Sequence, residues 1–122
     1  MRLGVLMTGL AIAATTGVGA KEPISIRVSP AMSFAPANLV IRTTVEPDAE
    51  NRAIEIVADS DEFYRASSVQ LEGDHAPKTT IFEFRSLPPG EYKVTAAVVG
   101  ADGKQRGSAR ASVKVIESGM SR

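Results

Sequence analysis

Acidic residues gather in one short segment, and their spacing would suit a calcium ion. Asp59, Asp61 and Glu62 stand together in residues 59–62. Calcium takes several carboxylate and carbonyl oxygens, and two aspartates at i and i+2 can share one ion. The glycine and the distal glutamate of an EF-hand loop are absent, and the same residues are typical of a solvated turn. Glu72 and Asp74 join this candidate metal site only if their loop approaches it.

His75 is the only imidazole in the chain, in a predicted loop between Asp74 and Ala76. Together with Met32 and Met120 it makes a candidate set of soft ligands for copper, although the three positions show no ligand spacing. A lone histidine in a loop is more often a solvated side chain. Because no Gly-x-Ser-x-Gly elbow exposes a serine, the sequence predicts no catalytic residues, no cofactor and no enzymatic activity.

An aromatic pair with an arginine follows the acidic segment directly. Phe63, Tyr64 and Arg65 form the best candidate for binding a ligand or partner, since tyrosine and arginine dominate interface hot spots. The alternative is structural. In that reading Phe63 closes one end of the core and Tyr64 covers an edge.

The first twenty residues have the pattern of a secretory signal peptide. Arg2 gives a positive start, residues 3–16 are uncharged and largely apolar, and Val18-Gly19-Ala20 is a small-residue cleavage site. We therefore expect a signal peptide at residues 1–20 and a secreted or periplasmic protein. An uncleaved N-terminal anchor is the alternative. Once the signal peptide is removed, the chain has no second apolar segment long enough to predict a membrane span.

Charge and cysteine content exclude several classes of protein. Arg2 is the only charged residue in the predicted signal peptide, so the remaining chain carries 13 basic and 14 acidic residues. A nucleic-acid-binding domain would show a basic stripe, which this balance disfavours. The chain has no Cys, which excludes a disulfide framework and cysteine-based metal or redox chemistry.

Beyond residue 20, apolar residues recur with a period of two, the pattern of strands with one face on a core. Seven such runs are separated by Pro-, Gly- and Asp-rich turns. They begin near Ile24, Leu39, Ile54, Val69, Phe82, Tyr92 and Ala109. Residues 30–36 are expected to be a link, and residues 61–66 could form a short helical turn. This pattern predicts one domain at residues 21–117 and a flexible tail at 118–122.

The segment LPPGEYKV, residues 87–94, forces a turn between two predicted strands. Leu87 ends one strand, Gly90 completes the turn, and Tyr92 opens the next strand. This segment resembles the E–F corner of immunoglobulin-like and fibronectin type III-like domains, with their tyrosine-corner motif. The resemblance implies a two-sheet antiparallel β-sandwich of about seven strands, in which the Tyr92 hydroxyl bonds to the backbone near Leu87 or Pro88. The disulfide and tryptophan of antibody domains are absent.

An export signal, a rigid scaffold and the lack of a credible nucleophile favour a non-enzymatic binding or accessory module of the cell envelope. Its expected partner is an envelope protein or glycan, and binding to nucleic acid is not expected. The alternative is a periplasmic sandwich protein that binds calcium or copper. Inhibition of a protease by the sandwich loops is a further alternative that the sequence leaves open.

Overall fold

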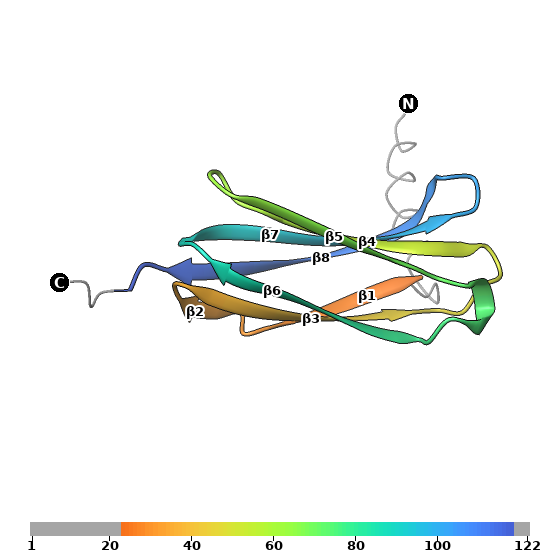
Figure 1. Ribbon diagram of the computed structural model, residues 1–122, viewed down its shortest axis with the longest axis horizontal. Coiled ribbons are helices and arrows are strands. Elements are labelled where there is room, and N and C mark those ends of the chain that lie inside the picture. The colour runs from red at the N-terminus through yellow and green to blue at the C-terminus, as the bar shows by residue number, and fades with distance from the viewer. Residues whose placement is uncertain (1–22, 119–122) are drawn as a thin grey trace, which may run out of the picture.

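A computed structural model describes residues 23–118, which form two β-sheets packed face to face (Figure 1). The predicted signal peptide and residues 119–122 of the predicted tail lie outside the described residues. The strands are β1 (Ile24–Ser29), β2 (Met32–Phe34), β3 (Ala37–Val45), β4 (Asn51–Asp59), β5 (Tyr64–Gln70), β6 (Thr79–Leu87), β7 (Gly90–Gly100) and β8 (Gln105–Ile116). Within residues 23–118 the one helical element is a 3-10 helix, η1 (Gly73–His75), and no helix there is long and apolar enough to cross a membrane.

The smaller sheet has the strand order β1-β3-β6, and the larger has the order β2-β8-β7-β4-β5. All neighbouring strands are antiparallel except β2 and β8, which are parallel. This arrangement confirms the predicted all-β, two-sheet sandwich. The strand count is eight rather than seven, because the expected link at residues 30–36 contains β2. The N-terminal part of the chain is therefore split, with β1 in one sheet and β2 in the other.

The core lies between the sheets and is built from the alternating apolar positions of the strands. In β3 every second residue from Ala37 to Val45 is buried, and in β7 every second residue from Tyr92 to Gly100 is buried. Thr43 is a polar member of this inward set, and its hydroxyl donates a hydrogen bond to the Thr80 carbonyl oxygen at 2.8 Å. Alternation fixes which face is apolar, so the core follows directly from the sequence period.

Two local predictions were wrong. The short helical turn expected at residues 61–66 is absent, because β5 already begins at Tyr64. The predicted strand near Val69 is therefore longer than its apolar pattern indicated. Strand β5 is the last strand of its sheet, and its residues are mostly exposed. An edge position removes the demand for apolar alternation that reveals a more central strand.

A polar network fixes the end of the sandwich that carries the β3–β4 turn. The Arg106 guanidinium donates to Asp48 Oδ2 at 2.8 Å and to Asn51 Oδ1 at 3.2 Å. The buried Asn51 side chain in turn donates to the Glu46 carbonyl oxygen at 3.0 Å. Arg106 belongs to β8, so this network joins the β3–β4 turn to the β7–β8 hairpin.

The core assignment can be tested with two neighbouring alanines of β7. Ala96 is fully buried, whereas Ala97 points to the opposite face and is partly exposed. Ala96→Asp should lower the free energy of unfolding by more than about 3 kcal/mol, because it buries a carboxylate without a partner. Ala97→Asp should cost much less. Urea denaturation of both variants measures the difference, and equal midpoints would contradict the inward orientation of Ala96.

Candidate functional site

The turn between β6 and β7 is organised around Tyr92. The Tyr92 ring is 2% exposed, and its hydroxyl donates to the Pro88 carbonyl oxygen at 2.6 Å. This is the backbone hydrogen bond that the resemblance to immunoglobulin-like and fibronectin type III-like domains implies. Leu87 points into the core and is fully buried. At Gly90 a Cβ atom would lie 3.2 Å from the Ser60 side chain, so glycine lets the β4–β5 loop approach the turn closely.

Phe63 and Arg65 extend this cluster across to the other sheet. The Phe63 ring meets the Tyr92 ring edge-on, with 6.3 Å between centroids, and the Arg65 guanidinium lies 5.2 Å above Phe63. Arg65 also donates to the Arg85 carbonyl oxygen at 3.1 Å. These contacts tie the β4–β5 loop to the β6–β7 turn and to β6. Aromatic pairs and cation–π contacts of this kind each add about 0.5–1.5 kcal/mol.

Tyr64 points the other way, and the predicted binding trio is therefore divided. Its side chain is 63% exposed on the outer face of the larger sheet, while Phe63 packs against the core and Arg65 is partly buried. Successive residues at the start of a strand face opposite sides of the sheet, which separates Tyr64 from its two neighbours. Of the three, Tyr64 alone is placed to meet a partner.

The predicted metal ligands do not gather into one group. Asp61 and Glu62 are exposed and line a shallow depression with Gly90 and Glu91, whereas Asp59 lies within β4. Within residues 23–118, no three His, Asp or Glu side chains are close enough to hold a metal ion.

The other proposed ligands lie elsewhere. Glu72 and Asp74 flank Gly73, which approaches the backbone of Ala49 at the opposite end of β4, so their loop does not reach Asp59. His75 is exposed, with Nε2 3.8 Å from the exposed Asp74 carboxylate. Met120 of the candidate copper set is outside the described residues.

The structure brings together a different set of residues on the outer face of the larger sheet. Cross-strand neighbours share a face, and the buried Tyr92 and Val113 point inward, so the residues beside them point outward. Two rows of cross-strand neighbours lie on this face. One row consists of Tyr64, Asp59, Lys93 and Ser112, and the other of Glu91, Lys114 and Met32. We call this set, together with Phe34, the outer-face strip.

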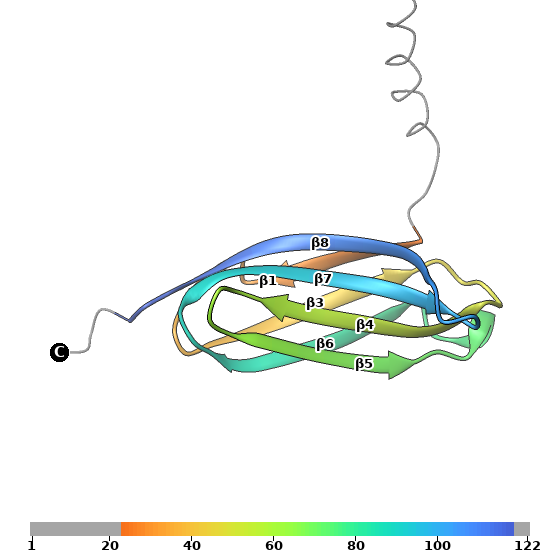
Figure 2. The ribbon, with the colours of Figure 1, turned by 90° about the horizontal axis from the view of Figure 1, so that it is seen from above.

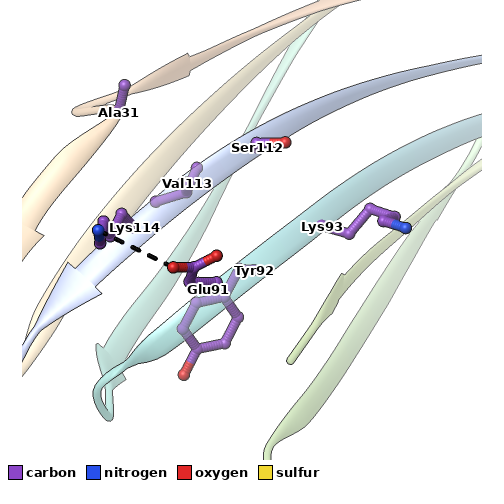
Figure 3. A pocket seen from close by; sticks show the side chains of 7 residues that line it. All are labelled: Ala31, Glu91, Tyr92, Lys93, Ser112, Val113 and Lys114. Carbon is purple, nitrogen blue, oxygen red and sulfur yellow. Dashed lines mark ion pairs between the residues drawn. The ribbon is translucent and has the colours of Figure 1, made fainter. Parts of the chain in front are cut away.

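The strip has large exposed apolar or aromatic side chains at its two ends and charged side chains between them. Met32 and Phe34 on β2 are 59% and 64% exposed, and Tyr64 stands at the other end on β5. Between them the sheet is hollowed into a depression of about 420 Å³, lined by Glu91, Lys93, Ser112 and Lys114 among others (Figure 3). The Lys114 ammonium faces the Glu91 carboxylate at 3.9 Å.

Sequence reasoning missed most of this strip. It placed Met32 and Phe34 in a link, although their separation by Ser33 between two prolines carries the period of a short strand. In the sequence, Lys93 and Lys114 show only as charged positions that alternate with apolar ones, which is typical of any solvent-facing side of a strand. Their approach to the apolar residues depends on the pairing of β2 with β8, which no local pattern reveals.

Comparison with known proteins identifies the fold. No protein-family model matches the chain, and a search of curated proteins finds no match. Among solved structures, it is similar to a superoxide reductase (neelaredoxin) from Ignicoccus hospitalis, with 15% identity and a TM-score of 0.55 over 78% of this chain and 80% of that one.

Two further structures extend the likeness. The fibronectin(III)-like modules of Clostridium thermocellum CbhA match with 10% identity and a TM-score of 0.55, over 78% of this chain and 98% of that one. A family 76 glycoside hydrolase from a bovine Bacteroides thetaiotaomicron strain matches with 16% identity and a TM-score of 0.56, over 80% of this chain and 21% of that one. At these identities the likeness concerns the fold alone. The chain therefore has a β-sandwich fold that it shares with fibronectin III-like modules.

The Tyr92 hydroxyl bond can be tested by Tyr92→Phe. This change keeps the ring and its contact with Phe63 but removes the donor to Pro88. We expect the free energy of unfolding at pH 7 to fall by about 0.5–1.5 kcal/mol, the usual net contribution of one hydrogen bond. Tyr64→Phe is the matched control and should have little effect, since that side chain is exposed. An unchanged denaturation midpoint for Tyr92→Phe would contradict a stabilising role for the bond.

Tyr92 should also make stability depend on alkaline pH. Burial raises the pKa of Tyr92, and its side-chain hydrogen bond with Ser60 and the charge of Arg65 partly offset that rise. Above pH 10 the unfolded chain then loses this proton before the folded chain does, so stability falls as pH increases toward the folded-state pKa. The slope from this group is at most about 1.4 kcal/mol per pH unit. Tyr92→Phe should flatten it, as measured by urea denaturation between pH 8 and pH 11 at ~1 unit steps.

Proposed function

We propose that the protein is an exported, non-enzymatic binding or accessory module of the cell envelope, and that it binds a protein partner through the outer-face strip. The observation that carries this proposal is the exposure of Met32, Phe34 and Tyr64 on one sheet face, on either side of a depression that carries the charged side chains of Glu91, Lys93 and Lys114. Aromatic residues and Met are enriched in protein interfaces relative to the remaining surface.

The dimensions of the strip suit a protein partner. Strands β2 and β5 are the two outer strands of the five-stranded sheet, so four strand spacings, roughly 19 Å, separate them. A small sugar could not contact Phe34 and Tyr64 at once, whereas a protein surface could. This separation rules out a monosaccharide as the ligand of the whole strip and suits an extended surface such as that of a protein.

The charges of the strip support a neutral, specific surface. Lys114 is beside Glu91, and Lys93 is aligned with Asp59, so each ammonium has an acidic neighbour. Such balanced charges would set orientation and select among partners more than they would add affinity. A nucleic acid would call for an excess of basic residues, which the strip does not have.

Export and the lack of catalysis belong to this proposal and rest on separate grounds. Export is inferred from the signal-peptide pattern of residues 1–20. A non-enzymatic role is supported by the position of His75, the one histidine of the sequence, which is exposed at the end of the sandwich away from the strip. No contact among the described residues favours the calcium or copper alternative over this proposal.

The proposal is tested by placing a photo-crosslinking amino acid on the two sheet faces. Positions 34 and 64 should capture the same envelope protein, and position 81 should not. Ile81 is the matched control because it is 53% exposed on the smaller sheet. Once the partner is purified, the double variant Phe34→Ser, Tyr64→Ser should weaken binding at least about tenfold, or ~1.4 kcal/mol, while Ile81→Ser should leave it unchanged. Equal losses in both variants would exclude the strip as the binding surface.

A further inference from the structure

We propose that two copies of this chain pair edge to edge through β5, so that their larger sheets join into one continuous sheet. This inference concerns the free backbone edge of β5 and does not depend on the function proposed for the outer-face strip. It rests on the state of that edge, on the sequence of β5, and on the way in which β5 and β6 cross.

Among the strands of residues 23–118, β5 has a neighbour on one side only. It pairs with β4 over its whole length without a register shift, and it is the terminal strand of its sheet. Ser60 N–H bonds to the Phe63 carbonyl oxygen, and Leu71 N–H bonds to the Arg52 carbonyl oxygen. The odd-numbered residues of β5 therefore bond to β4. The backbone groups of the even-numbered residues, Tyr64, Ala66, Ser68 and Gln70, face away from β4.

The other outer strands carry features that discourage pairing. Strand β2 has three residues and lies between Pro30 and Pro36, and β1 lies between Pro23 and Pro30 and carries Arg27. In β6, Glu83 and Arg85 form an exposed ion pair at 3.1 Å, and Ser86 near its end has a positive φ of 58°. Short length, proline, charge and local distortion are the usual protection of sheet edges.

Strand β5 has little such protection. It contains no Pro, Gly or Lys, and residues 66–70 (ASSVQ) are uncharged. Its single charge, Arg65, is held toward its own chain by the Phe63 ring and the Arg85 carbonyl oxygen. A regular edge strand of seven residues whose one charge is turned toward its own chain is a template for another strand.

The sequence of β5 is complementary to itself in one antiparallel register. With Ser67 opposite Ser67 of a second copy, Tyr64 pairs with Gln70 and Ala66 pairs with Ser68. The four residues whose backbone groups face away from β4 are then all in hydrogen-bonded pairs, and each pair exchanges two backbone bonds. Arg65 lies opposite Val69, so no like charges meet. The interface is isologous, with its two-fold axis at Ser67.

The second sheet leaves room for this pairing. Figure 2 shows that β5 and β6 cross rather than lie one above the other, and that β6 extends beyond β5 at the start of β5 but is set back at the arrowhead of β5. A two-fold rotation at Ser67 puts the Gln70 end of one β5 beside the Tyr64 end of the other. The projecting end of each β6 would then lie beneath the part of the partner's β5 where the partner's own β6 is set back.

The chain offers a direct test of the register, because it contains no Cys. Opposed residues of a pair without backbone hydrogen bonds have Cα atoms about 4.5 Å apart, within the range that a disulfide spans. On mild oxidation of the purified protein, Ser67→Cys should form a disulfide-linked dimer. Ser112→Cys, at an exposed serine on the outer face of the same sheet, is the matched control and should form little disulfide-linked dimer. Sedimentation equilibrium of the unmodified protein should show a concentration-dependent doubling of mass.

Two variants should abolish the dimer. Ser67→Lys places two ammonium groups opposite each other at the two-fold axis. Ala66→Pro removes a backbone N–H that points away from β4, toward the second copy, and leaves the bonds to β4 intact. Circular dichroism checks that each variant is folded, and either folded variant suffices for the test. A monomer at all concentrations up to ~100 µM, well above a micromolar Kd, would overturn the proposal. So would equal cross-linking through Ser67→Cys and Ser112→Cys.

Discussion

The contact between the inner faces of the two sheets is the interaction on which the rest of this structure depends. The chain has no Cys, so no disulfide joins the sheets, and apolar packing holds them together. Every inward position must therefore be apolar or internally bonded, as Thr43 is through its hydroxyl. A slip of one residue in β3, β4 or β7 would turn its apolar side chains into solvent, and this requirement fixes the register of the ladders that order the surface residues.

Tyr92 connects the core to both loops at one end of the sandwich. Its ring is packed in the core, its hydroxyl closes the β6–β7 turn, and its edge contact with Phe63 holds the β4–β5 loop. Arg65 completes this group by reaching β6. The rigidity of this end matters for the outer-face strip, because Tyr64 stands between Phe63 and Arg65 in the chain. Its neighbours are fixed inward, and Tyr64 is thereby fixed outward.

The fold could be predicted from the sequence, and the arrangement of the surface could not. Period-two alternation at Leu39, Ile41 and Val94 identified buried faces, because burial on one side of a strand is a local constraint. Strand β5 was largely missed, since an edge strand such as Tyr64–Gln70 needs no apolar pattern. The outer-face strip could not be predicted for a different reason. It is assembled by the non-local pairing of β2 with β8, and a single sequence carries no record of which strands become neighbours.

The split of the N-terminal chain between the sheets has a mechanical consequence. Strand β2 runs parallel to β8, and the bonds from Lys114 N–H to Ala31 and from Ala35 N–H to Ile116 extend this pairing at both ends. A load that pulls residue 23 and residue 118 apart draws β2 and β8 in opposite directions along their axes. The hydrogen bonds between them then bear the force together rather than breaking one after another. The β2–β8 pair is therefore the part of the sandwich that resists shear along its long axis.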